Sequence, residues 1–228
     1  TFANVPGVAI PPILGTKVAY DLEKMTWIAR VSVDYYMLGV AGNSKIKSLD
    51  DLKKMSMGQV IKMPSTGVGS TADAMSKIFI GVLGIKGEVV SGYKGTKEMT
   101  VAVIRGDVPA SSLPINSMRK YVQSGDVRAL LTTEDPSPFA GAPSAKSLGF
   151  DDLDGLAIQR LAGAAPGIPH EIQQILSDAF VKAMADPKLQ AAANKSKRPF
   201  APLGGEEAAR VLKKQLAVYL KFKDALAK

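Results

Sequence analysis

The segment best suited to chemistry is Ser65-Thr66-Gly67-Val68-Gly69-Ser70-Thr71, which lies between a predicted strand and a predicted helix. Glycines let the backbone turn tightly and approach a ligand, and the first amides of a helix have no partner within the helix. The helix dipole adds attraction for negative charge, and the Ser and Thr side chains supply hydroxyl donors. This segment, the glycine loop, is therefore predicted to bind a small anion.

Two other interpretations of the glycine loop stay open. Gly67 to Ala72 satisfies the dinucleotide pattern G-x-G-x-x-A, which requires an acidic residue at the end of the following strand to bind the ribose. The strand Glu88-Val89-Val90 ends instead in Ser91, Gly92 and Tyr93, so a small anion fits better than a dinucleotide. The loop is otherwise a purely structural turn between a strand and a helix.

Two further segments also connect a predicted strand to a predicted helix. The first offers Tyr93, Lys94 and Gly95, which supply an aromatic ring, a positive charge and another helix start. The second offers Asn116 and Ser117, either of which is expected to cap its helix. We expect the three helix starts to lie at the same end of neighbouring parallel strands and to converge on one crevice, where open α/β sheets bind ligands.

Catalytic groups are scarce in this chain. Cysteine is absent, and the single histidine, His170, follows Pro169 at the start of a predicted helix, where a solvated position is the ordinary one. The acidic pairs and triplets occur where helix caps and turns favour Asp. We therefore predict no enzymatic activity, no metal and no cofactor.

The rest of the chain alternates strand-like and helix-like segments, which favours an α/β fold with mostly parallel sheets. Ser48 with Asp51 three residues later predicts a capping box. A strand is predicted from Val108. Helices are expected after Pro169 and from about Glu206, each with an apolar stripe that should pack in a core. The stripes contain Ile172, Ile175, Leu176, Phe180 and Met184 in the first helix, and Val211, Leu212, Leu216, Tyr219 and Leu226 in the second.

Charge and hydropathy narrow the class of partner. The 228 residues carry a formal net charge of +8, which favours anionic partners. The basic residues are scattered, with Lys195-Ser196-Lys197-Arg198 the nearest to a cluster, so we predict no nucleic-acid binding. The longest apolar run, from Ile78 to Ile85, is far shorter than a membrane span. The chain starts at Thr1 with no leader, so any signal peptide lies outside this sequence.

Short motifs in a fixed order span the chain and resemble those of one family. Gly92-Tyr93-Lys94-Gly95 is similar to the family's P-Y-K-G, and the glycine loop to its G-S-A-G-V-G-S-T. The other matching segments are Tyr20-Asp21, Trp27 to Val31, Gly125 to Leu130, Gly167 to Pro169, and Ala185 to Pro187. On these motifs the chain resembles the Bug-type periplasmic receptors of tripartite tricarboxylate transporters.

The resemblance implies a fold and a function. It implies a two-lobed clamshell of the type II periplasmic-binding-protein kind, with residues 1–37 and 157–228 in the first lobe and 38–156 in the second. Members bind small organic carboxylates, such as di- or tricarboxylates, in the periplasm as monomers, and deliver them to membrane permease subunits. Full-length members begin with a further strand, glycine-rich loop and helix, so the first lobe is expected to be incomplete.

Departures from the family pattern concern the ligand. Asp73 stands where the family usually has His, and its charge would repel a carboxylate if it faced the ligand. Arg160 replaces a common aromatic residue, where it either pairs with a distal carboxylate or is simply exposed. Leu113-Pro114 replaces the family's D-N. The alternative function is the effector-binding domain of a cytoplasmic transcription regulator, which shares the clamshell plan.

Overall fold

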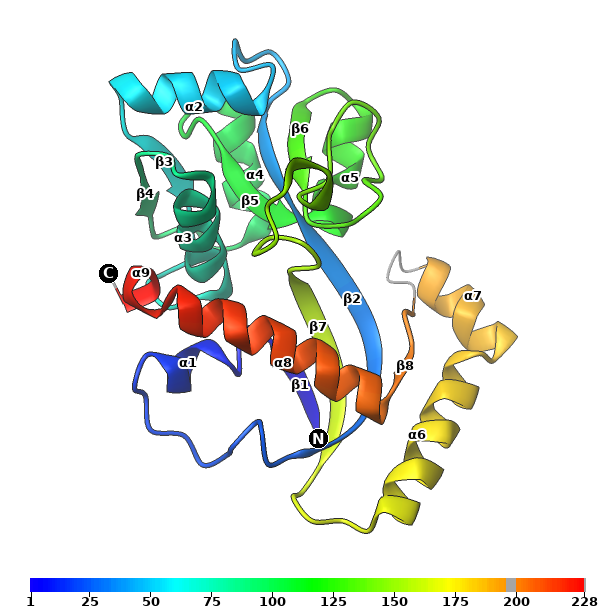
Figure 1. Cartoon of the computed structure of the whole chain (residues 1–228). Helices are drawn as coiled ribbons and strands as arrows, with labels where there is room; N and C mark the ends of the chain where they lie inside the picture. The colour runs from blue at the N-terminus through cyan, green and yellow to red at the C-terminus, as the bar shows by residue number, and fades with distance from the viewer. Residues whose placement is uncertain (196–199, 228) are drawn as a thin grey trace. The chain divides into compact units, whose positions relative to one another are not determined.

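The computed structural model describes residues 1–195 and 200–227, so Ser196, Lys197 and Arg198 of the basic cluster lie outside the described residues. Its contacts divide the chain into two compact units. Unit 1 consists of Thr1–Asp34 and Ile158–Lys221, and unit 2 of Tyr35–Ala157 with the residues from Phe222 onward. The α/β fold class predicted from the sequence is confirmed by the alternating helices and strands of Figure 1.

Unit 2 contains one parallel strand pair, and its two other described strand pairs are antiparallel. The strands β3 and β4 pair in parallel, with Ile61 opposite Gly87, and α3 connects them. The strands β5 and β6 both pair antiparallel with the long strand β2. The elements of this unit are the second half of β2 (Thr26–Ala41), α2 (Leu49–Gly58), β3 (Ile61–Pro64), α3 (Thr71–Leu83), β4 (Gly87–Val90), α4 (Thr96–Arg105), β5 (Ser111–Pro114), α5 (Ile115–Gln123), β6 (Val127–Thr132), η1 (Lys146–Leu148) and α9 (Lys223–Ala227).

The helices of unit 2 begin and end at residues suited to those positions. The predicted capping box is confirmed at α2, where Ser48 accepts the Asp51 amide and Asp51 accepts the Ser48 amide. Helix α4 ends at Gly106, which adopts φ 80°, a left-handed conformation that favours glycine. These local signals set the helix ends without tertiary contacts.

The core of unit 2 holds α3 firmly in place. Seven of its thirteen residues are buried, among them Ile78 and Phe79, which are fully inaccessible. A second cluster lies under α4 and α5, made of Met37, Met99, Leu113, Ile115, Met118, Val127, Ala129, Phe139 and Ala142. The strand-to-helix loops therefore connect elements that are closely packed in the core of unit 2.

Unit 1 is built on antiparallel strands. The strand β1 pairs antiparallel with β7, with Phe2 opposite Ala162, and β8 pairs antiparallel with β2. The elements are β1 (Phe2–Val5), α1 (Ile10–Ile13), the first half of β2, β7 (Ala157–Ala164), α6 (His170–Met184), α7 (Pro187–Lys195), β8 (Leu203–Gly204) and α8 (Gly205–Lys221). In the described ranges no helix combines the length and apolar character needed to cross a bilayer.

The prediction of mostly parallel sheets is wrong. It assumed that each strand–helix–strand segment forms a parallel pair, as β3–α3–β4 does. Instead β2, sixteen residues long, is an antiparallel partner for β5, β6 and β8. Sequence alternation determines which elements follow one another, but it does not determine which strands become neighbours in a sheet.

Of the two apolar stripes predicted to pack in a core, the one in α8 is confirmed and the one in α6 is mostly wrong. In α8, Leu212, Leu216 and Tyr219 are buried. In α6, Ile172, Ile175 and Leu176 are exposed, and only Ser177 and Met184 are buried. The spacing predicted the helix correctly, but it could not tell whether another element covers its apolar face.

Three local predictions also need correction. The strand expected from Val108 begins at Ser111, although Val108 is buried before it. Neither Asn116 nor Ser117 caps α5, because the helix begins earlier, at Ile115, with Pro114 in the cap position. The residues from Phe222 group with unit 2, whereas the prediction placed all of 157–228 in the first lobe. The Phe222 ring packs so close to Gly81 of α3 that a Cβ there would lie 3.0 Å from it.

Candidate functional site

The glycine loop connects β3 to α3, as the sequence predicts. Gly69 adopts φ 75°, and Ser70 caps α3 by accepting the Asp73 amide at 3.2 Å. The side chain of Val68 is 82% exposed, and Thr66 is exposed as well. The loop therefore presents its middle residues to solvent and uses its last ones to begin the helix.

Several backbone amides of this region are available to a ligand. The amides of Thr66, Gly67 and Val68 in the loop, and of Thr71 and Ala72 at the helix start, bond to no other group in the described ranges. Such amides at a helix start attract anions through their N–H dipoles. The geometry therefore supports binding of a small anion by backbone groups.

The second loop lies against the first. The hydroxyls of Ser65 and Ser91 are 2.9 Å apart, and the Tyr93 amide donates to the Ser65 carbonyl at 3.2 Å. Tyr93 is partly buried and packs against the apolar cluster of Ala102, Val103 and Val108, as well as against the larger cluster described above. The structure thus brings together two of the three segments singled out in the sequence.

The second loop contains a hydrogen bond that the sequence analysis did not predict. The Lys94 amide donates to the carboxylate of Glu98, one turn into α4. The Lys94 side chain is exposed, and Gly95 precedes the helix with no side-chain cap. Sequence analysis missed Glu98, although an acid in the first turn of a helix is a common partner for amides just before it.

The third segment is connected to the first through α3. The hydroxyls of Ser76 in α3 and Ser112 in β5 are 3.1 Å apart, and both side chains are buried. Asn116 lies in the first turn of α5, half-buried, and Ser117 beside it is exposed. Their contact with a ligand stays a prediction.

Arg160 belongs to the other compact unit. It lies on β7, opposite Asn4 of β1, and its guanidinium donates to the Ser32 hydroxyl at 3.3 Å. That bond lies within unit 1, whereas the two loops lie in unit 2. Its role as a partner for a distal carboxylate stays a prediction.

The described residues contain no group of three or more His, Cys, Asp or Glu side chains able to hold a metal ion. His170 is exposed at the first position of α6.

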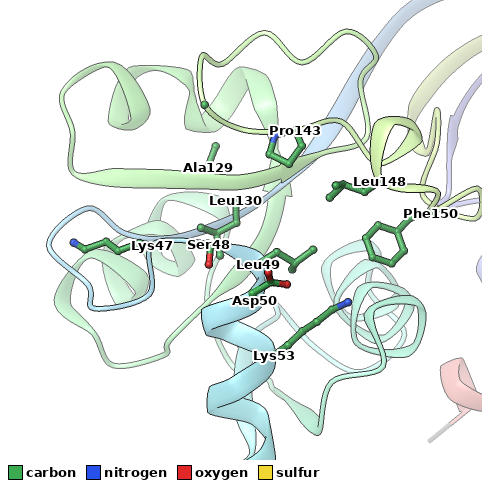
Figure 2. Close-up of a pocket in the computed structure, with 11 residues that line it drawn as sticks. Lys47, Ser48, Leu49, Asp50, Lys53, Ala129, Leu130, Pro143, Leu148 and Phe150 are labelled. Atoms are coloured by element: carbon green, nitrogen blue, oxygen red, sulfur yellow. The ribbon is translucent and has the colours of Figure 1, made fainter.

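Unit 2 also contains a cavity of about 390 Å³ at the start of α2 (Figure 2). Its lining includes none of the predicted site residues and consists of Lys47, Ser48, Leu49, Asp50, Lys53, Ala129, Leu130, Gly141, Pro143, Leu148 and Phe150. The Lys53 ammonium lies 5.1 Å from the centre of the Phe150 ring, within cation–π range. Sequence analysis did not find this cavity, because its walls come from separate elements.

Residues 2–216 match the family model described as tripartite tricarboxylate transporter family receptor. No curated protein matches the chain.

Among solved structures, a TctC solute-binding protein from Polaromonas has a TM-score of 0.85 at 18% identity, over 98% of this chain and 77% of that one. The periplasmic binding protein BugD has a TM-score of 0.73 at 18% identity, over 98% and 77%. MatC from Rhodopseudomonas palustris, with bound malate, has a TM-score of 0.72 at 16% identity, over 100% and 78%.

Proposed function

Since this chain belongs to the receptor family of tripartite tricarboxylate transporters, we propose that it is a periplasmic receptor for a small organic carboxylate. Unit 1 and unit 2 are proposed to be the two lobes of a clamshell, and the bound acid is passed to membrane permease subunits. The malate found in MatC, a relative of the same fold, supports a dicarboxylate as the ligand class. Family membership favours this function over the effector domain of a transcription regulator.

The observation that carries the proposal is the pair of adjoining loops in unit 2. The glycine loop offers unpaired amides of Thr66, Gly67 and Val68 beside the N-terminus of α3. The bond between Ser65 and Tyr93 sets the second loop next to it. Backbone amides recognise the carboxylate group of a ligand without contacting the rest of it. This site is therefore suited to a class of carboxylic acids rather than to a single acid.

The proposal is tested by the effect of acids on thermal unfolding. Malate, succinate, citrate and acetate are compared with neutral succinamide, which lacks the charge. A ligand present at one hundred times its Kd adds about 2.7 kcal/mol, which corresponds to roughly 5–10 °C in Tm for a chain of this size. We expect such a shift with at least one of the acids and none with succinamide.

A matched pair of variants locates the site. The Val68 side chain is 82% exposed, so neither Val68→Glu nor Val68→Gln should disturb folding. The Glu variant places a negative charge beside the free amides and should abolish the shift, whereas the Gln variant should retain it. Equal shifts in the two variants would rule out the glycine loop as the binding site, and no shift with any acid in the unaltered chain would rule out the function.

A further inference from the structure

Asp73 is a buried carboxylate in contact with the glycine loop. It lies in the first turn of α3, and its side chain is 3% exposed. Its Oδ2 atom accepts the Gly69 amide at 2.9 Å and the Lys77 ammonium at 2.8 Å. One amide of the glycine loop is therefore occupied by a carboxylate of the chain itself.

This contact has two opposing consequences for an anionic ligand. The bond to Gly69 fixes the loop in its left-handed turn, which orders the free amides before any ligand binds. The negative charge of Asp73, however, lies beside those amides and would repel an incoming carboxylate. The structure contains a positively charged group that can offset this repulsion while the bond between Asp73 and Gly69 stays in place.

That group is Lys77, one turn further along α3. Its side chain is only 13% exposed, so the ion pair with Asp73 is largely shielded from solvent. A shielded pair is screened less by salt than a surface pair, and the positive charge of Lys77 opposes the repulsion that Asp73 exerts on a nearby anion.

The C-terminal segment holds Lys77 in this position. The ammonium also donates to the carbonyl of Leu226 in α9 at 3.2 Å. Phe222, just before α9, packs beside Gly81 of α3. The Leu226 carbonyl is a second partner for the ammonium and limits its freedom to turn away from Asp73, which keeps the neutralising charge where it is needed.

We propose that Lys77 is a positioning residue of the carboxylate site, which neutralises Asp73 so that Asp73 can order the glycine loop without repelling the ligand. The inference rests on the proposed function. It gives a specific role to an ion pair that is not itself proposed to contact the ligand. It also assigns a role to α9, which sets the orientation of Lys77.

The test measures malate affinity by calorimetry in four proteins. Lys77→Met leaves the Asp73 charge unpaired and should weaken binding about ten- to hundredfold. The double variant Asp73→Asn with Lys77→Met has neither charge, while Asn can still accept the Gly69 amide, so its affinity should return to within about threefold of the unaltered chain. Lys77→Arg retains the positive charge and should bind nearly normally.

Ligand charge separates neutralisation from a merely structural role. Removing Lys77 should weaken malate, a dianion, more than acetate, a monoanion, because repulsion scales with ligand charge. Loss of folding in Lys77→Met would lower the affinities for both acids equally. The inference is overturned if the double variant binds malate as weakly as Lys77→Met, or if both acids lose affinity to the same extent.

Hydrogen exchange over residues 65–72 gives a readout that needs no ligand. The loop should exchange faster in Asp73→Ala, which removes the acceptor of the Gly69 amide, than in Asp73→Asn, which retains one. If the unaltered chain binds none of the acids, the proposed function fails, and the exchange rates still decide whether Asp73 orders the loop. Equal rates in the two variants would contradict that role.

Discussion

The helices α3 and α6 have similar apolar spacing but very different surroundings. α3, in unit 2, buries seven residues, including Ile78 and Phe79, and supports the glycine loop. α6, in unit 1, buries only Ser177 and Met184 and leaves Ile175 63% exposed. In unit 2 the glycine loop is therefore connected to a closely packed helix. In unit 1 the apolar face of α6 contributes little to the core.

The largest expected effect is in α3. Ile78 is fully buried, so Ile78→Ala removes buried methyl groups and leaves a cavity. We expect the free energy of unfolding to fall by about 2–5 kcal/mol, as measured by urea denaturation followed by circular dichroism. A loss below about 1 kcal/mol would mean that α3 is less closely packed than the structure indicates.

The capping box of α2 provides an effect of intermediate size. Ser48 Oγ accepts the Asp51 amide at 3.1 Å, and Ser48→Ala removes this acceptor. The free energy of unfolding should fall by about 0.5–2 kcal/mol. Ser48→Thr keeps a hydroxyl in the cap position and is the matched control. If the Ala and Thr variants were equally stable, the cap would contribute nothing to unit 2.

The smallest effect is expected in α6, from the same substitution as in α3. Ile175→Ala changes a side chain that is mostly exposed, and alanine is the better helix former. Stability should change by less than about 0.5 kcal/mol. The fluorescence of Trp27, the single tryptophan, reports on unit 1 and provides the measurement. A loss above about 1.5 kcal/mol would show that the apolar face of α6 is covered in solution.

Much of the local structure could be predicted from the sequence. The glycine loop, the capping box at Ser48 and the end of α4 at Gly106 depend on contacts within a few residues, so the local sequence contains the information. The start of α5 was predicted wrongly, because the capping rule selects a residue with a side-chain acceptor, whereas α5 begins after Pro114, which has none.

The surroundings of Asp73 could be predicted from the sequence only in part. The sequence predicted that Asp73 lies near a helix start and that its charge would repel an anionic ligand if it faced that ligand. Its partners Gly69 and Lys77 are near in sequence, but the shielding of the pair depends on α9, which is about 150 residues away in the chain and contributes the Leu226 carbonyl. The cavity beside α2 was missed for the same reason, since α2 and the connection after β6 are distant in sequence.

The sequence by itself determined the α/β class, the strand–loop–helix segments and, through ordered motifs, the receptor family. These features depend on residue types at short spacing, where steric and hydrogen-bond rules act directly. Only the tertiary structure decided that β2 is an antiparallel partner of three strands, that the apolar face of α6 is exposed, and that the Leu226 carbonyl of α9 accepts a hydrogen bond from Lys77. Each of these depends on which distant segments pack together, because burial and pairing are properties of the whole folded chain.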